Sequence, residues 1–195
     1  MNGEPNSPET MTASAPLLAA AAAGDERAWR ALVDLYGRRV FAMARSRCKD
    51  STVAEDITQS VFATVAEKIG SGGYAEQGKF ESWLFRVVMN RVRDHVRRLR
   101  RRPDAPDAGA IERHVSPEAT PTDSLMVDRL RWAMDQLSEA DREVVEMRHH
   151  GGMSFKAMAD VLDEPVGTLL ARHHRALRKL KELLETGPVT TGEVH

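Results

Sequence analysis

The stretch from Phe80 to Arg102, FESWLFRVVMNRVRDHVRRLRRR, begins with apolar residues and ends in arginines. Apolar side chains recur along it at steps of three or four residues, which predicts a helix with one buried face: Leu84, Val88, Val92, Val96 and Leu99. From Arg86 onward the other faces carry arginine and only one acid, Asp94. Guanidinium groups bind phosphate through paired hydrogen bonds, so this face is suited to a polyanion. An ordinary solvated helix face is the alternative, but such faces usually mix charges of both signs.

Composition limits the class of protein. The chain has 195 residues and a formal net charge of −1, so its basic residues are concentrated locally and not in overall excess. A single cysteine, Cys48, excludes an intramolecular disulfide and a multi-cysteine metal site, and we expect it to be buried. No apolar run approaches the roughly 20 residues that span a bilayer, and the N-terminus lacks the pattern of a signal peptide. We therefore expect a soluble, cytoplasmic protein without membrane insertion.

The part of the chain before the arginine-rich segment also predicts helices. Residues 1–13 are polar and aperiodic, so we expect a disordered tail. Ser14 is placed to cap a short helix and Asp25 to cap a longer one. Residues 53–69 carry an apolar residue at every fourth position, which predicts a third helix. Residues 70–79 are rich in glycine and predict a flexible loop, so residues 14–102 form one helical module.

A second module follows a linker. Residues 103–124 contain four prolines and no periodicity, which is typical of a linker. Residues 125–186 then show a helical stripe and three further capped segments, and residues 187–195 form a short tail. The first stripe consists of Leu130, Ala133, Met134 and Leu137, and the helix-ending signals are Gly151-Gly152 and Asp163-Glu164-Pro165. No segment alternates as a strand does, so we predict an all-α protein with two small helical domains.

Residues 154–181 have the layout of a helix-turn-helix, with a short capped helix, a turn and a longer helix. In that motif the first turn of the second helix reaches base edges in the major groove, so Thr168 and Arg172 are candidates for base contacts. Arg175 and Lys179 are placed to reach flanking phosphates. Helical hairpins with basic faces also occur in protein-binding modules, which remains the alternative. We expect the longer helix to bury Leu169, Ala176, Leu177, Leu180 and Leu184.

Taken together, the two modules resemble the extracytoplasmic-function (ECF) group of bacterial sigma factors. In the first module the resemblance rests on AEDITQSVF (54–62) and FESWLFRVVMNRVRDHVRR (80–98). In the second it rests on LSEADREVVEMRHHGGMSFKAMADVLDEPVGTLLARHHRALRKL (137–180). The resemblance implies a protein that binds core RNA polymerase, recognises and melts the minus-ten promoter element with its first module, and recognises the minus-thirty-five element as duplex with its second. It implies neither enzymatic activity nor a cofactor.

The resemblance also implies roles for single residues. Asp56, Gln59 and Phe62 match the helix that docks on the coiled coil of the largest polymerase subunit, although a core position is the alternative for Phe62. Tyr74 lies in the loop where family members capture a flipped-out base, and it is placed to stack on one. Trp83 also has the character of a stacking residue, but its apolar neighbours favour burial. The helix facing the minus-ten element is matched by Asn90, Arg93, Asp94, Arg97 and Arg98.

The second long helix departs from the family pattern. Leu170 and Leu177 stand where polar or basic residues are usual, and His173 stands where leucine is usual. The departures indicate a rotated apolar stripe and leave open which residues of this helix contact bases, although Thr168, Arg172 and Arg175 match the family's recognition helix. The pairs His149-His150 and His173-His174 do not predict a metal site, because neighbouring residues on a helix point about 100° apart.

The implied partners are core RNA polymerase, through its largest-subunit coiled coil and its flap region, promoter DNA, and an anti-sigma factor. The competing hypothesis is a stand-alone DNA-binding regulator that uses only residues 125–186. Such a regulator has no use for the AEDITQSVF helix. An enzyme is disfavoured, because the sequence shows no nucleophile–base pair, no phosphate-binding glycine loop and no cluster of metal ligands.

Overall fold

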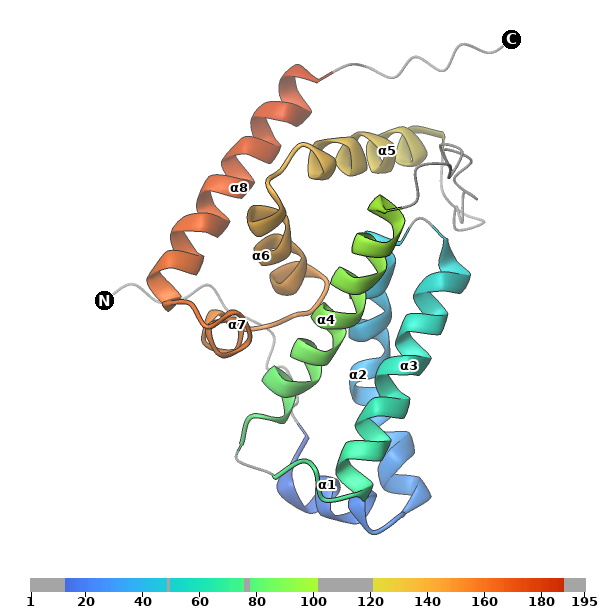
Figure 1. Cartoon of the computed structure of the whole chain (residues 1–195). Helices are drawn as coiled ribbons and strands as arrows, with labels where there is room; N and C mark the ends of the chain where they lie inside the picture. The colour runs from blue at the N-terminus through green and yellow to red at the C-terminus, as the bar shows by residue number, and fades with distance from the viewer. Residues whose placement is uncertain (1–12, 49, 76–77, 102–120, 188–195) are drawn as a thin grey trace.

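The computed structural model describes residues 13–48, 50–75, 78–101 and 121–187, and within these ranges it contains eight helices and no strand (Figure 1). The all-α prediction is therefore confirmed. The tails predicted at 1–13 and 187–195, apart from Ala13 and Gly187, and most of the predicted linker lie outside the described residues. Among the described helices, none is both long enough and apolar enough to cross a bilayer.

The first module consists of four helices: α1 (Ala15–Ala22), α2 (Glu26–Arg47), α3 (Ser51–Gly70) and α4 (Phe80–Arg100). Both predicted caps are present. The Ser14 hydroxyl accepts a hydrogen bond from the Leu17 amide at 3.4 Å, and the Asp25 carboxylate accepts from the next helix at 2.7 and 3.2 Å. These side chains satisfy amide groups that the first helical turn leaves without partners, which is why the helices begin at these positions.

The second module contains the other four helices: α5 (Pro121–Asp135), α6 (Glu139–His149), α7 (Phe155–Leu162) and α8 (Val166–Thr186). The hydroxyls of Ser138 and Ser154 cap α6 and α7. Helix α5 begins at Pro121 and not near Leu125, since proline is well tolerated in a first helical turn. Helix α8 begins at Val166, before Thr168, because the extended residue Pro165 occupies its N-cap.

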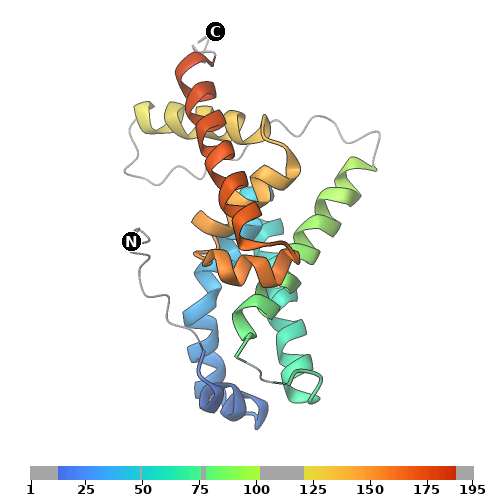
Figure 2. The ribbon, with the colours of Figure 1, turned by 90° about the vertical axis from the view of Figure 1, so that its left-hand side faces the viewer.

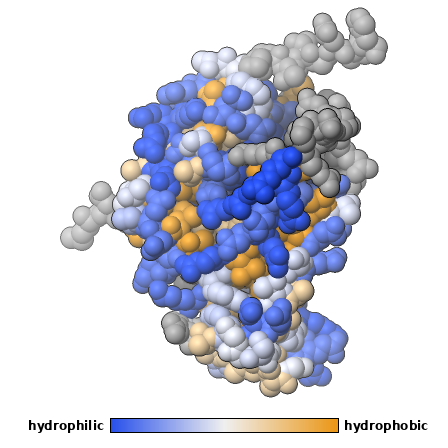
Figure 3. Space-filling view, in the orientation of Figure 1, coloured by the Kyte–Doolittle hydropathy of each residue, from blue (hydrophilic) through white to orange (hydrophobic). Residues whose placement is uncertain are grey.

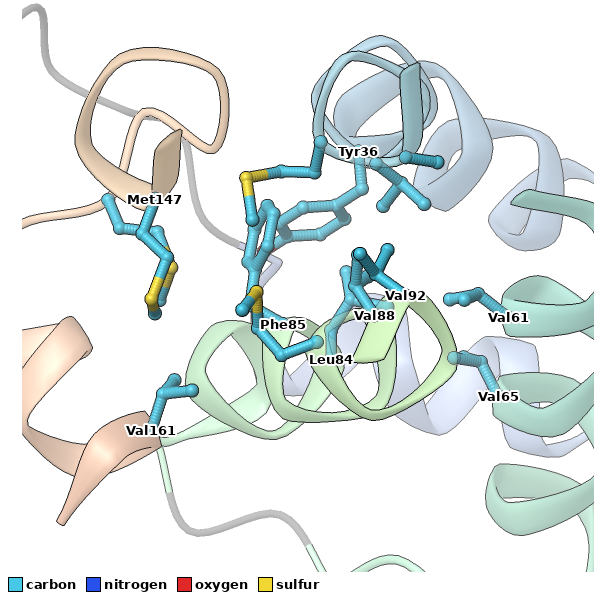
Figure 4. Close-up of a cluster of buried hydrophobic side chains, with 14 of the residues drawn as sticks. Tyr36, Val61, Val65, Leu84, Phe85, Val88, Val92, Met147 and Val161 are labelled. Carbon is cyan, nitrogen blue, oxygen red and sulfur yellow. The ribbon is translucent and has the colours of Figure 1, made fainter. Parts of the chain in front are cut away.

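The core of the first module lies between α2, α3 and α4. The apolar stripe of α3 is buried from Ile57 to Ile69, and Leu84, Val88 and Val92 of α4 are fully buried against it (Figure 4). The stripe prediction is wrong at the end of α4, where Leu99 is 49% exposed. Cys48 is buried as expected, and burial raises the pKa of its thiol to about 11.

The two modules pack against each other. Helix α7 packs on α4 and α6 packs on α2, and Figure 2 shows α7 crossing over the first module. Figure 4 shows Met147 of α6 and Val161 of α7 facing Phe85 of α4, and all three belong to one buried cluster with the core of the first module. The sequence predicted two modules and a linker between them, but it contained no signal for this packing.

Two further apolar predictions are wrong. Leu130 and Leu177 each continue a predicted helical stripe, yet they are 46% and 37% exposed. His173, by contrast, is only 9% exposed and takes the place in the α8 stripe between Leu169 and Ala176. Leu177 directly follows the buried Ala176, and consecutive residues of a helix point about 100° apart, so its side chain lies at the edge of the buried stripe.

Candidate nucleic-acid interface

The outer face of α4 carries a stripe of four polar residues, Arg86, Asn90, Arg93 and Arg97, which we call the α4 outer stripe. The spacing of three and four residues places them on one side of the helix. Figure 3 shows a strongly hydrophilic band over α4, with apolar side chains of neighbouring elements beside it. A row of this kind can follow a nucleic-acid backbone and present an amide to a base edge.

The C-terminal half of this face is exposed. Asn90, Arg97 and Arg98 are open to solvent. Asp94 orients both arginines, because its carboxylate lies 3.3 Å from Nη1 of Arg97 and its backbone carbonyl accepts from Nε of Arg98 at 3.3 Å. Contacts this long between exposed groups are weak, so both guanidinium groups can exchange them for phosphate.

The middle of the stripe is occupied by the second module. Arg93 donates two parallel hydrogen bonds to the two carboxylate oxygens of Glu143 on α6, both at 2.7 Å. These hydrogen bonds hold the pKa of Arg93 above its ordinary value. Arg86 donates to the backbone carbonyl of Asp160 on α7. The structure therefore brings Arg93, a predicted DNA contact, onto a carboxylate of its own chain.

A second group of ions joins α2 to α6. Nε of Arg47 donates to Glu146 and its Nη1 to Glu139, while Arg142 donates to the other oxygen of Glu146 at 2.8 Å. Arg142 also donates to the backbone carbonyl of Ser46 at 2.9 Å. The Glu146 side chain is 1% exposed, and a carboxylate so deeply buried is stable only with such partners. The sequence did not single out these residues, because the pairs are about a hundred residues apart.

Arg39 forms a third contact between the modules. Its Nε donates to the carbonyl of Gly151 at 2.6 Å, and another nitrogen pairs with Glu81 of α4. The guanidinium carbon lies 5.5 Å from the ring centre of Tyr36 and 4.9 Å from that of Phe85, which adds cation–π attraction. Together these contacts hold the turn after α6 against the first module.

Two guanidinium nitrogens at this junction are buried without a hydrogen-bond partner among the described residues. They are Nη1 of Arg39 and Nη2 of Arg47. Each unsatisfied buried donor costs on the order of 1–3 kcal/mol. The free energy of packing the two modules together therefore includes a loss from these unsatisfied donors as well as a gain from apolar burial.

The glycine-rich loop leads into an aromatic cluster. Tyr74 is half-buried, with its ring centre 5.6 Å from that of Phe80 and 4.6 Å from that of Trp83. Its amide donates to the carbonyl of Lys68 at 3.0 Å. Trp83, which we expected to be buried, is half-buried in the same cluster. Tyr74 therefore packs against aromatic side chains in this structure, and stacking on a base requires a rearrangement of this cluster.

The outer face of α3 differs from that of α4. Asp56 and Gln59 are exposed, and Phe62 beside them is half-buried. Helix α3 packs on α1, α2 and α4. The sequence left two alternatives for Phe62, a docking residue and a core residue. The structure lies between them, since one part of the side chain contacts the core and another contacts solvent.

The basic residues of α8 are partly paired. Thr168 and Arg175 are exposed, and the nearest acid to Arg175 is Asp141 at 3.5 Å. Two nitrogens of Arg172 contact the carboxylate of Glu164 at 2.9 and 2.7 Å. Lys179 donates to the carbonyl of Gln136 at 2.7 Å.

A histidine pair lies between α6 and α8. The Nε2 atoms of His149 and His173 are 3.1 Å apart, and the rings are stacked with centres 5.3 Å apart. Burial, together with the neighbouring His149, lowers the pKa of His173 to about 4. The sequence reasoning considered adjacent histidines and missed this pair from different helices. Within the described part of the chain, no group of three or more potential metal ligands comes together.

Comparison with known proteins matches each helical module to a family. A family model described as Sigma-70 region 2 matches residues 32–102, and one described as Sigma-70, region 4 matches residues 133–182. The ECF RNA polymerase sigma factor BldN of Streptomyces coelicolor is 32% identical over 174 residues, which cover 86% of this chain and 64% of BldN. This chain thus spans slightly less than two thirds of the length of that relative.

Other relatives are matched over most of their length. The RNA polymerase sigma-H factor of Pseudomonas aeruginosa is 28% identical, over 83% of this chain and 89% of that protein. The ECF RNA polymerase sigma-E factor of Escherichia coli K12 is 27% identical, over 78% and 84%. Among solved structures, CnrH in complex with the cytosolic domain of CnrY matches with a TM-score of 0.67 at 27% identity, over 89% of this chain and 97% of CnrH.

Proposed function

The chain belongs to the ECF group of RNA polymerase sigma factors, and we propose that it binds core RNA polymerase, brings it to promoters and supports opening of the duplex. The observation that carries this proposal is the order of the two family matches, one on each helical module. A role of this kind is not catalytic, since the polymerase performs the chemistry. It is exercised where the polymerase and the chromosome are, in the cytoplasm.

The proposed division of the chain follows the modules. Residues 14–102 act as the region 2 domain and residues 125–186 as the region 4 domain, with residues 103–124 as the linker between them. The tails are residues 1–13 and 187–195. Two modules that contact one DNA molecule gain affinity from each other's binding, provided that the linker allows both to reach their elements at once.

Polymerase docking is assigned to the outer face of α3. Asp56 and Gln59 are exposed there beside Phe62, whose solvent-facing part can enter a pocket of a partner helix. An aromatic side chain surrounded by polar groups is typical of a small interface hot spot. The chemistry of this face therefore fits the coiled coil of the largest polymerase subunit. The flap region is assigned to the second module.

Recognition of the minus-ten element is assigned to the outer face of α4 and the loop before it. Asn90 has an amide that can pair with a base edge, whereas Arg93, Arg97 and Arg98 bind phosphates. Asp94 orients the two exposed arginines. Tyr74 supplies an aromatic ring for an unstacked base after the cluster around it rearranges.

Recognition of the minus-thirty-five element is assigned to α8. Thr168 and Arg172 lie in its first two turns, where a recognition helix contacts base edges. Arg175 and Lys179 follow on the same helix and are assigned to phosphates. Arg172 and Lys179 must exchange their present partners, Glu164 and the carbonyl of Gln136, for DNA.

Melting follows from differential binding. Unstacking a base costs a few kcal/mol, and the basic face of α4 and the aromatic loop repay this cost only after the base has left the duplex. The free protein is therefore expected to bind promoter DNA weakly and to open it only together with polymerase. The similar protein CnrH was solved in complex with the cytosolic domain of CnrY, and a Bartonella quintana sigma factor was solved in complex with an anti-sigma factor. We therefore include an anti-sigma factor among the proposed partners.

Run-off transcription with purified core polymerase and a library of genomic promoters tests this proposal. We expect initiation at a subset of promoters that depends on both proteins. Absence of polymerase-dependent initiation at every promoter would reject the proposal. A stand-alone regulator predicts the opposite pattern, in which the full chain without polymerase binds a specific duplex with nanomolar affinity.

A further inference from the structure

We propose that the exposed aliphatic side chain of Leu170 on α8 recognises the methyl group of a thymine in the minus-thirty-five element. This inference rests on the proposed function of α8 and names the base that the helix prefers. Leu170 and Leu177 both depart from the family pattern, and the function proposed above uses neither residue. Leu170 lies in the first two turns of α8, which are the part of a recognition helix that enters the major groove.

The surface of the first two turns of α8 is almost entirely apolar. Residues 166–171 are all among those that the structure describes, and every one except the buried Leu169 is exposed. The exposed residues are Val166, Gly167, Thr168, Leu170 and Ala171, of which Thr168 alone has a polar side chain. A helix that reads bases through hydrogen bonds carries polar groups at such positions. This helix instead presents aliphatic carbon to the groove.

The packing of α8 determines which side of the helix carries Leu170. Leu169 is fully buried and His173 is 9% exposed, so these residues hold one side of the helix on the module. Leu170 is 37% exposed beside them, and Val166, one turn before it on the same side, is 39% exposed. The two side chains begin an exposed apolar ridge that continues to Leu177, seven residues after Leu170.

Arg172 does not supply a free polar group to these turns in the observed arrangement. Two of its nitrogens contact the carboxylate of Glu164, at 2.9 and 2.7 Å, and its side chain is only 17% exposed. Leu170, by contrast, is open to a ligand without any rearrangement. Leu170 can therefore contact a base edge before Arg172 exchanges its partner.

Thymine is the base whose major-groove edge suits an aliphatic side chain. Its C5-methyl group is the only methyl group that a standard base pair presents in this groove. Contact between that methyl group and Leu170 removes apolar surface of both from water. Over guanine or cytosine the same side chain would cover a hydrogen-bonding group without replacing the water that it lost. Leu170 thus favours thymine and disfavours a G·C pair at the same position.

Cations on α8 are placed to hold a duplex against this surface. Arg175 and Arg178 follow Ala171 at steps of four and three residues, which places all three on one side of the helix. Both arginines are exposed. Phosphate contacts fix the position of a helix on the duplex but carry no sequence information, so the choice of base depends on the first two turns.

Replacement of thymine by deoxyuridine tests the proposal, because it removes one methyl group and keeps the base pair. The templates derive from a promoter that the run-off assay identifies, with each thymine of its minus-thirty-five region replaced in turn. The protein is the full chain bound to core polymerase, and initiation is measured at limiting holoenzyme. We expect at least one replacement to lower initiation about four-fold, which is the effect of losing one buried methyl group.

A matched pair of variants then assigns this effect to one side chain. Leu170→Ala should make the thymine and deoxyuridine templates equivalent, because the shorter side chain no longer reaches the methyl group. Leu177→Ala is the control, since Leu177 is also 37% exposed and lies on the same side of α8, beyond the first two turns. It should keep the difference between the templates. Circular dichroism of each variant checks that the helices are intact.

A change of specificity provides a second test. Leu170→Arg places a guanidinium group over the same base pair, and arginine pairs with the O6 and N7 atoms of guanine. We expect the preferred base to change from thymine to guanine at that position and at no other. Leu177→Arg adds the same charge to the same side of α8, so it should strengthen binding to all templates without changing the preferred base.

The outcomes separate this inference from the proposed function. Initiation that no deoxyuridine in the minus-thirty-five region affects would overturn the inference. So would an unchanged ratio between the two templates in Leu170→Ala, and an equal loss on both would indicate that the apolar ridge docks another protein. These results leave the sigma-factor assignment in place, because initiation still depends on the chain and on polymerase. Absence of initiation at every promoter instead rejects that assignment, and this inference with it.

Discussion

The outer faces of α3 and α4 belong to adjacent helices of one bundle, yet the second module contacts only the face of α4. The face of α3 is left open, with Asp56 and Gln59 exposed. The face of α4 is partly covered, with Arg86 and Arg93 bound to α7 and α6. The second module thus contacts the basic face of α4 and leaves the face of α3, which carries the acid Asp56, exposed.

The difference follows from charge. Helix α6 of the second module carries the acids Glu139, Glu143 and Glu146, and arginines of α2 and α4 pair with them. The basic face that we propose for DNA attracts acids of its own chain, whereas the face that we propose for polymerase has no excess of basic residues to attract them. The predictions below separate the two faces, beginning with the largest expected effect.

Truncation of Phe85 should cause the largest loss of stability. Phe85 is fully buried and contributes to the core between both modules, so Phe85→Ala should lower the free energy of unfolding by about 3–5 kcal/mol. Urea unfolding followed by circular dichroism measures this loss. Val33→Ala is the control, because Val33 is 43% exposed and should cost less than about 0.5 kcal/mol. A loss equal to that of the control would show that the junction is not packed as described.

Removal of two exposed arginines from α4 should weaken DNA binding without changing polymerase binding. Arg97→Ala together with Arg98→Ala should weaken single-stranded DNA binding about ten-fold and lower the salt slope by about 0.7 for each lost phosphate contact. Polymerase binding should not change. Arg27→Ala together with Arg30→Ala, an equal loss of charge from exposed positions on α2, is the matched control. An equal effect of both double variants would mean that only net charge matters.

Truncation of Phe62 is the corresponding change on α3. Phe62→Ala should weaken binding to core polymerase by about 1–2 kcal/mol and leave DNA binding unaltered. Fluorescence anisotropy of the labelled chain with core polymerase measures the effect. Phe41→Ala, also at a half-buried phenylalanine but on α2, controls for general loosening of the core. If Phe62→Ala instead lowers stability without changing affinity, Phe62 is a core residue.

The smallest effect concerns pH and the second module alone. Burial lowers the pKa of His173 from 6.5 to about 4, so between these values the unfolded chain binds more protons than the folded one. Stability should therefore fall as the pH is lowered from 7.5 to 5, by about 1–2 kcal/mol from this residue. His173→Leu should remove this part of the pH dependence, whereas the exposed His174→Gln should keep it. Identical profiles for the two variants would contradict the assignment.

Local features of the fold were predictable from the sequence. The capping residues Ser14 and Asp25 were identified correctly, because a cap involves residues only two or three positions away. The buried stripe of α3 was likewise predicted from its four-residue spacing. The family resemblance added the functional assignment, which spacing alone could not supply.

Long-range features were not predictable. Arg93 looked free for DNA because its partner, Glu143, lies 50 residues away on another module. Tyr74 looked available for stacking because its aromatic neighbours occur later in the chain. His173 looked polar, although its neighbour His149 lets it occupy an apolar position. In each case the deciding contact depends on how elements pack, and a periodic pattern does not encode that.

The two buried guanidinium nitrogens that lack partners among the described residues, on Arg39 and Arg47, weaken the packing between the modules. When the modules part, water reaches both nitrogens and restores the bonds that closure denied them. Hydration of these two groups would therefore offset part of the free energy that opposes separation of the modules.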